Sequence, residues 1–216
     1  MIEIIPTILV KSFKEVKERI RKVENYVKWV QLDIMDGVFV DKISWRNPQD
    51  LKGFEKRVKL EAHLMIQKPG EVIDNWLDVV DRVIIHYEAS NNIEDLIKRA
   101  RSKNKQIGLA INPETSIEVV NPLLPRTTRG RGKKDLDLVL IMTVNPGKGG
   151  QEFKDEVLTK IETLRGMWPD GNIEVDGGIN PENAKKVINA GANLICAGTY
   201  IFKSKDIKQA IESLKK

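Results

Sequence analysis

The sequence has one cysteine, Cys196, among 216 residues. A lone cysteine excludes an internal disulfide, which favours a reducing cytoplasm as the compartment. No run approaches the roughly 20 apolar residues that a membrane span requires, so we expect no membrane association. The first ten residues, MIEIIPTILV, lack the basic stretch and small-residue cleavage site of a signal peptide.

The chain also has little net charge: it is +5, with a pI near 9.1. Most Lys and Arg residues alternate with Asp and Glu, as in KEVKERIRKVE, which is typical of a solvated helix surface. The exception is the basic segment Arg126 to Lys134, RTTRGRGKK, which has no aromatic residue to stack on bases. We interpret this segment as a solvated loop and expect no nucleic-acid partner, while a homo-oligomer is left open.

Short β-branched runs alternate with longer amphipathic segments, with no linker or composition break. The eight candidate strands are Glu3–Leu9, Lys28–Met35, Val58–Met65, Arg82–Glu88, Gln106–Asn112, Asp137–Val144, Asn172–Gly177 and Asn193–Gly198. Apolar residues at helical spacing begin at Phe13, Ile93, Val157, Ala184 and Ile207, whereas the segments after strands two and five are poor helices. This pattern predicts an α/β fold, a single (β/α)8 TIM barrel over residues 1–216.

Active sites of such barrels lie where strands end and the following loops begin. Side chains alternate with period two along a strand, which shows which of them point inward together. The side chains predicted to meet at one opening are Thr7, Gln31, Asp33, Met35, His63, Met65, Met142 and Asp176. The segment Leu123 to Lys134 precedes strand six, so we expect it at the opposite, amino-terminal face.

Asp33 and Asp176 come from strands on different sides of the predicted ring. Two carboxylates across a cavity can serve opposite faces of one substrate carbon, one removing a proton and the other returning one. The alternative is that each aspartate only caps a turn or pairs with a lysine. Asp36, next to Gly37, lies on the outward phase of the strand, and we predict that its side chain stabilises the turn.

His63 is predicted at the same depth as these carboxylates. Imidazole and carboxylate ligands suit Zn²⁺, Mn²⁺ or Fe²⁺, and such a cation would stabilise an enediolate formed beside a carbonyl. A buried structural histidine is the alternative. The methionines at 35, 65 and 142 are either core filler or an apolar wall that excludes water.

Glycine-containing turns follow strands six, seven and eight, at Asn145–Gly150, Asp176–Gly178 and Ala197–Thr199. Glycine lets backbone N–H groups approach an anion closely, and the loops after strands seven and eight form the common phosphate site of this fold. We therefore predict a phosphate cradle, with tight turns alone as the alternative.

Together these motifs resemble the ribulose-phosphate 3-epimerase family over nearly the whole chain. The segments that carry the resemblance are LDIMDGVFV (Leu32–Val40), AHLMI (Ala62–Ile66), IHYEA (Ile85–Ala89), MTVNPG (Met142–Gly147), EVDGGIN (Glu174–Asn180) and AGA (Ala190–Ala192). Their combination and order are specific for the family.

The resemblance implies a metal-dependent epimerase that interconverts D-ribulose 5-phosphate and D-xylulose 5-phosphate at C3 through a cis-enediolate, a step of the pentose phosphate pathway. It implies that Asp33 and Asp176 are the acid/base pair and that both, with His63, ligate the metal. The substrate contacts that it implies are Thr7, Met35, Met65, Met142, Gly147, Gly149, Gly177, Gly178, Gly198 and Thr199.

Two departures from the family pattern affect this expectation. Gln31 stands where the family has a histidine ligand, and an amide oxygen can bind a hard cation but is a poorer zinc ligand than imidazole. The alternatives are a more weakly bound metal, a different metal, with Mn²⁺ or Mg²⁺ favoured among Zn²⁺, Mn²⁺, Fe²⁺ and Mg²⁺, or no metal. Val38 replaces a histidine in the loop that helps to close over the sugar. This change leaves open an epimerase for a six-carbon ketose phosphate such as allulose 6-phosphate.

Two further classes compete with the epimerase. The related phosphosugar decarboxylases and aldolases use an Asp-x-Lys-x-x-Asp arrangement, which is disfavoured because Met35 stands two residues after Asp33. A non-catalytic phosphosugar-binding barrel is suggested by Gln31 and the altered loop. It is opposed by the joint presence of both aspartates, the histidine and the three methionines, so the sequence favours the epimerase.

Overall fold

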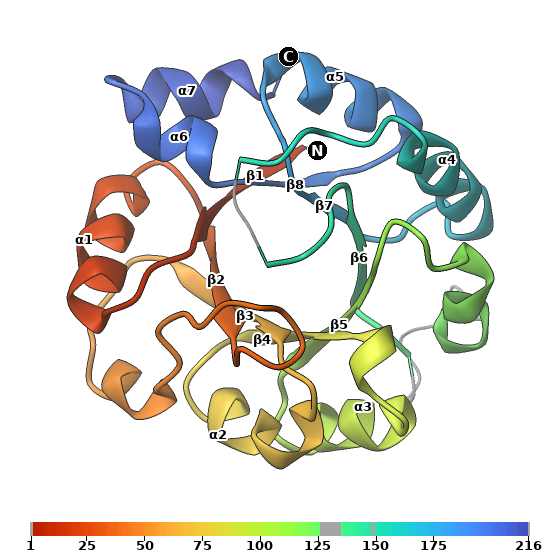
Figure 1. The fold of residues 1–216 in the computed structure, drawn as a ribbon, viewed down its shortest axis with the longest axis horizontal. Coiled ribbons are helices and arrows are strands. Elements are labelled where there is room, and N and C mark those ends of the chain that lie inside the picture. Colours follow the sequence, from red (N-terminus) through yellow and green to blue (C-terminus); the bar gives the residue numbers. More distant parts are fainter. Residues whose placement is uncertain (1, 126–134, 148–149, 216) are drawn as a thin grey trace.

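A computed structural model describes residues 2–125, 135–147 and 150–215 and shows one closed barrel of eight parallel strands (Figure 1). Neighbouring strands are consecutive in sequence, and β8 pairs with β1. The strands are β1 Glu3–Ile8, β2 Trp29–Met35, β3 Lys59–Met65, β4 Arg82–His86, β5 Gln106–Ile111, β6 Leu138–Met142, β7 Ile173–Asp176 and β8 Leu194–Ala197. The predicted fold is confirmed, and each strand boundary lies within two residues of its expected position.

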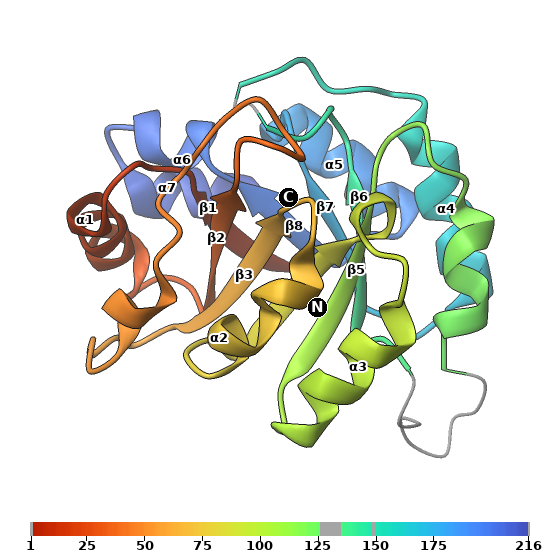
Figure 2. The ribbon, with the colours of Figure 1, turned by 60° about the horizontal axis from the view of Figure 1, so that its bottom comes forward.

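Helices form a ring outside the strands (Figures 1 and 2). They are α1 Phe13–Val23, α2 Ile73–Leu77, α3 Ile93–Ser102, α4 Val157–Met167, α5 Pro181–Ala190, α6 Thr199–Lys203 and α7 Ile207–Ser213. After β2 and β5 the described residues form 3-10 turns, at Pro48–Leu51 and Ile117–Leu123, and no α-helix, as the poor helical pattern predicts. The sequence did not indicate α2 and α6, because five residues are too few to show a helical period.

The main core lies between the strands and the helices. Val30, Leu32 and Ile34 point outward from β2 and are almost completely buried, as are Val16 and Ile20 on the inner face of α1. Burying each such side chain contributes about 1.5–3 kcal/mol, so this layer is the main source of stability. The remaining side chains of β2 therefore point into the barrel.

The interior of the barrel is polar as well as apolar. Strand register places Asp33 beside His63, and Glu61 beside Arg82 one layer below. The Arg82 guanidinium donates to Glu61 and, at 3.4 Å, to Glu174. This buried ion network fills the barrel beneath the carboxyl ends of the strands.

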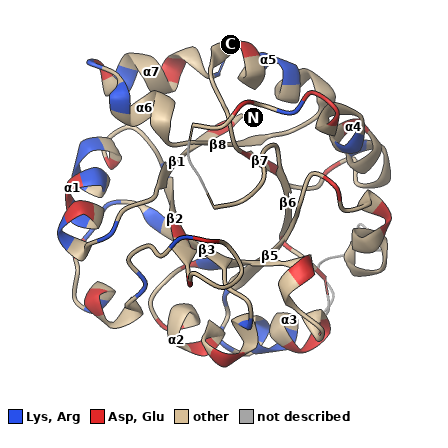
Figure 3. Ribbon diagram, in the orientation of Figure 1, with Lys and Arg blue, Asp and Glu red and all other residues tan. Residues whose placement is uncertain are grey.

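Lys and Arg residues are mixed with Asp and Glu over the outer helices (Figure 3). This distribution agrees with the solvated helix surfaces expected from the sequence. The basic segment Arg126 to Lys134 lies outside the described residues; the chain leaves the described part at Pro125 and re-enters it at Asp135, just before β6. Within the described ranges, no helix combines the length and apolar character needed to cross a membrane.

Candidate active site

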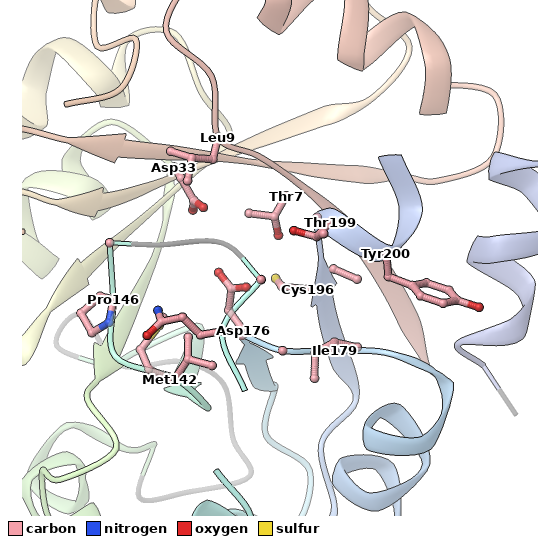
Figure 4. A pocket seen from close by; sticks show the side chains of 18 of the residues that line it. Thr7, Leu9, Asp33, Met142, Pro146, Asp176, Ile179, Cys196, Thr199 and Tyr200 are labelled. Atoms are coloured by element: carbon pink, nitrogen blue, oxygen red, sulfur yellow. The ribbon is translucent and has the colours of Figure 1, made fainter. Parts of the chain in front are cut away.

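A cavity of about 710 Å³ opens at the carboxyl ends of the strands. Asp33 of β2 and Asp176 of β7 point into it from different walls, and Thr7 lies between them in the view (Figure 4). The predicted substrate contacts that line the cavity are Thr7, Met35, Met65, Met142, Gly147, Gly177, Gly178, Gly198 and Thr199. Gly149, the remaining one, lies outside the described residues.

Gln31 connects the two aspartates. Its amide nitrogen, Nε2, donates to Asp176 Oδ2 at 2.7 Å and to Asp33 Oδ1 at 3.0 Å, while its Oε1 lies 3.4 Å from the Cys196 Sγ. Gln31 is fully buried behind the cavity. In this orientation the side chain is a donor to the carboxylates, and a half-turn about its Cγ–Cδ bond would present the oxygen instead.

Asp176 holds its proton more tightly than an ordinary aspartate does. Burial and the charge of Asp33 raise the pKa of Asp176 to about 7, against the opposing effects of His63 and Gln31. One carboxyl of the pair therefore holds a proton near neutral pH while the site contains no cation. Such a difference between paired carboxyls is what acid/base catalysis requires.

His63 lies directly behind the aspartates. Its Nδ1 is 3.2 Å from Asp33 Oδ1 and 3.8 Å from Asp176 Oδ2. Burial opposes a charge on the ring, but the carboxylates of Asp33 and Asp176 raise the pKa of His63 overall. The predicted carboxylate–imidazole cluster is therefore present.

The other nitrogen of His63 contacts a residue to which the sequence assigned no role. His63 Nε2 lies 2.9 Å from His86 Nε2, and His86 Nδ1 lies 3.3 Å from Glu88 Oε2. In the sequence, His86 and Glu88 belong to the family segment IHYEA, without a role of their own. The His-x-Glu pair at the end of a strand was the one signal that could have identified them.

The cluster can accommodate a divalent cation. Asp33, His63 and Asp176 each offer one ligand atom, and these atoms lie within 4.8 Å of one another. Two carboxylates with an imidazole suit Zn²⁺, Mn²⁺ or Fe²⁺. All three side chains are buried or nearly so, and among the described residues no lysine or arginine forms an ion pair with them. The described residues therefore fit a metal site.

Two of the glycine turns at the other side of the cavity pack too closely against their neighbours to hold a larger side chain. A Cβ at Gly177, whose φ is +124°, would lie 2.5 Å from Val144 Cγ2, and a Cβ at Gly198 would lie 2.9 Å from the Thr7 carbonyl oxygen. The Thr7 hydroxyl is buried and has no hydrogen-bond partner among the described residues. A ligand hydroxyl in the cavity would supply that partner.

The sequence profile of the Ribulose-phosphate 3 epimerase family matches residues 3–202. The chain belongs to this family. The Ribulose-phosphate 3-epimerase of Schizosaccharomyces pombe is 34% identical, over 99% of this chain and 92% of that protein. The Ribulose-phosphate 3-epimerase of Bacillus subtilis is also 34% identical, over 100% of this chain and 99% of that protein.

Solved structures of other phosphosugar enzymes have the same fold. The 3-hexulose-6-phosphate synthase of Salmonella typhimurium superimposes with a TM-score of 0.72 at 15% identity, over 99% of this chain and 96% of that one. The 3-keto-L-gulonate-6-phosphate decarboxylase of Vibrio cholerae gives 0.73 at 12% identity, over 99% and 95%. At these identities the likeness shows the (β/α)8 fold alone.

This member of the ribulose-phosphate 3-epimerase family closes the cavity with an apolar wall. Met35 and Met65 are almost fully buried and pack with Val40 from the loop after β2. Asp36 holds that loop by accepting hydrogen bonds from the backbone N–H groups of Val38, at 2.8 Å, and Phe39, at 2.9 Å. Its predicted role in the turn is therefore confirmed.

Proposed function

We propose that the chain interconverts D-ribulose 5-phosphate and D-xylulose 5-phosphate by moving a proton at C3. The observation that carries the proposal is the pair Asp33 and Asp176, which face one cavity from β2 and β7 and share the Gln31 amide. The relatives in this family are named for the same reaction. A small phosphorylated ketose is therefore the proposed substrate.

The two carboxyls would act on opposite faces of the substrate carbon. In one direction Asp176 would enter the reaction protonated, while Asp33 takes the proton from C3. Asp176 then delivers its proton to the other face, and the roles exchange in the reverse direction. Before a cation enters, Gln31 keeps both carboxyls oriented toward the cavity.

Asp33, His63 and Asp176 would hold a divalent cation, with Gln31 Oε1 as a fourth ligand after its amide turns. When bound, this cation supplies positive charge that stabilises negative oxygens on the substrate. Mn²⁺ or Mg²⁺ is favoured over Zn²⁺ or Fe²⁺, because an amide oxygen suits harder cations better than zinc.

The remainder of the cavity would bind and shield the substrate. The turns at Gly147, Gly177–Gly178 and Gly198–Thr199 present backbone N–H groups for the phosphate. The unpartnered Thr7 hydroxyl would bind a sugar hydroxyl. The methionine wall would exclude water that could quench the enediolate. A cytoplasmic location fits the single, buried cysteine.

Proton NMR of ribulose 5-phosphate with the purified protein in D₂O tests the proposal. Reactions run with no metal, Mg²⁺, Mn²⁺ or Zn²⁺ are quenched with chelator before the spectra are recorded. We expect deuterium at C3 together with xylulose 5-phosphate. Failure of the folded protein to exchange C3 under every metal would contradict the proposal. Exchange of allulose 6-phosphate alone would instead assign a six-carbon substrate.

A further inference from the structure

His63, His86 and Glu88 form a continuous chain of side chains behind the active site. His63 lies on β3, His86 on β4 and Glu88 in the 3-10 turn Tyr87–Ala89 that follows it. Both imidazoles have no exposed surface, and Phe39 from the loop after β2 covers His86 with ring centroids 4.8 Å apart. The contact between the two imidazoles is therefore shielded from solvent, whereas Glu88 lies partly exposed at the outer end of the chain of side chains.

The two rings meet through their nitrogen edges. Their planes differ by 20° and their centroids are 5.0 Å apart, whereas the two Nε2 atoms are only 2.9 Å apart. A separation of 2.9 Å is too short for atoms in rings stacked face to face, and it is the usual length of an N–H···N hydrogen bond. One Nε2 must therefore carry a hydrogen and the other a lone pair.

Glu88 determines the direction in which hydrogen bonds are donated along these three side chains. Its Oε1 accepts the backbone N–H of Asn112 at 2.9 Å and the hydroxyl of Thr115. Burial alone would raise the pKa of Glu88, but the hydrogen bonds from His86, Asn112 and Thr115 lower it to about 2. The carboxylate is thus only an acceptor, so His86 Nδ1 must carry a hydrogen.

His86 in turn determines which nitrogen of His63 carries a hydrogen. Because the His86 ring has no exposed surface, its uncharged form is favoured, and the single hydrogen of that form is on Nδ1, which faces Glu88. Its Nε2 is then an acceptor, and the hydrogen between the rings belongs to His63 Nε2. A neutral His63 consequently presents the lone pair of Nδ1 toward Asp33 and Asp176.

We propose that His86 and Glu88 are positioning residues that fix the tautomer of His63, so that its Nδ1 lone pair faces the cation site. The tautomer of His63 follows from the hydrogen bonds themselves. Only its use, to present a lone pair to a cation, rests on the proposed metal-dependent function. Outer partners of this kind orient a histidine ligand, and losing one costs about 10- to 100-fold in metal affinity.

The substitution Glu88→Gln should reverse the direction of hydrogen-bond donation along the three side chains without changing their arrangement. The backbone N–H of Asn112 still requires an acceptor, which keeps the amide oxygen at the Oε1 position. The amide nitrogen then takes the Oε2 position and donates to His86 Nδ1. His86 must carry its hydrogen on Nε2, and His63 is left with a hydrogen on Nδ1, directed at the cation site.

The chain contains only two histidines, so nitrogen-15 NMR of histidine-labelled protein reports on these two rings alone. Without metal at pH 7, we expect His86 as the Nδ1–H tautomer in the unmodified protein and as the Nε2–H tautomer in Glu88→Gln. The variant His86→Asn assigns the two sets of signals. Finding the Nε2–H tautomer of His86 in the unmodified protein would overturn the proposal, whether or not any variant folds.

The second measurement is the affinity for Zn²⁺, which is determined by titration against a competing chelator. We expect Glu88→Gln to bind Zn²⁺ about 10- to 100-fold more weakly. Glu114→Gln is the matched control, because Glu114 lies on the same loop as Asn112 and pairs only with exposed Lys154, at 2.6 Å. Unchanged zinc affinity in Glu88→Gln would refute the role. Neither measurement depends on epimerase turnover, so a failure of the proposed reaction would remain distinguishable.

Discussion

At the scale of the residue, the reactive feature is a pair of carboxyls with different affinities for a proton. Asp176 lies 13% exposed at the cavity wall, with its pKa raised by burial and by Asp33. Gln31 donates to both carboxyls from one nitrogen, so neither aspartate can rotate away without losing a hydrogen bond. The site is therefore preorganised before any substrate or cation enters.

Asp176→Asn should reduce turnover by at least about 10²- to 10⁴-fold, because the amide can neither take nor deliver the C3 proton. The fold should persist, since the substitution keeps the side-chain shape. C3 exchange in D₂O and thermal unfolding measure the two effects. Asp78→Asn, at an exposed aspartate that pairs with Lys103, should leave turnover unchanged. Normal exchange by Asp176→Asn would refute the acid/base role.

Gln31→His should tighten zinc binding by at least about tenfold, because imidazole is a better zinc ligand than an amide oxygen. Gln31 already directs its polar end at Asp33 and Asp176, so the new ring enters the same position. Zinc titration against a chelator measures the change. The control Gln49→His adds an imidazole at an exposed position. Equal zinc affinities in both variants would show that residue 31 is not a ligand.

Glu88 should contribute stability that depends on pH. Because hydrogen bonds lower its pKa from 4.5 to about 2, the contribution is complete above pH 4.5 and is lost as the pH falls toward 2. The difference in unfolding free energy between the unmodified protein and Glu88→Gln should shrink by about 1–2 kcal/mol from pH 5 to pH 3. Urea unfolding at each pH measures it. A difference that stays constant would contradict the lowered pKa.

At the scale of the element, the loop after β2 is tied to the end of its own strand. Ser44 donates to the Asp33 carbonyl oxygen at 2.6 Å and accepts the Met35 N–H at 2.9 Å. Both groups lie where β2 ends, so one hydroxyl fixes the loop and the backbone of Asp33 together. The same loop carries Phe39 onto His86 and Val40 onto the methionines.

Ser44→Ala should cost about 1–3 kcal/mol of unfolding free energy, because it leaves a buried N–H and a buried carbonyl without their partner. Turnover should fall as well, since the backbone of Asp33 loses its anchor. Urea unfolding and the C3 exchange assay measure the two effects. Ser102→Ala removes an exposed helix hydroxyl that donates to Arg99 and should change stability by less than about 0.5 kcal/mol. Equal stabilities in the two variants would contradict the anchoring role.

At the scale of the whole molecule, the active site stands on a buried ion network. Arg82 neutralises part of the charge of Glu61 and Glu174 and lies over the Trp29 ring at 4.2 Å. Burial and the neighbouring Glu61 raise the pKa of Glu174 well above its usual value. The network joins β2, β3, β4 and β7 across the inside of the barrel.

Arg82→Met should destabilise the barrel by about 3–5 kcal/mol, because Glu61 is left as an uncompensated buried charge. The double variant Arg82→Met, Glu61→Leu should recover much of that loss, since it removes the charge as well. Urea unfolding of the two proteins compares them. A double variant that is no more stable than Arg82→Met would show that packing, and not charge, determines the role of Arg82.

The sequence by itself determined the barrel, the boundaries of its strands and the side chains that meet at its opening. These features follow from local patterns: β-branched runs, the period of two along each strand, and glycines at strand ends. Asp33, His63 and Asp176 were found because each lies on the inward phase of a strand that ends at the same face. The family motifs add to these patterns without depending on the tertiary structure.

Only the tertiary structure decided how these side chains face one another. The amide nitrogen of Gln31 contacts Asp176 from a strand 145 residues away in sequence, which no local pattern encodes. The contact between His63 and His86 depends on the register and tilt of β3 and β4, and its direction depends on Glu88 and the backbone of Asn112. Hydrogen bonds require a placement within a few tenths of an ångström, and only the packed barrel supplies it.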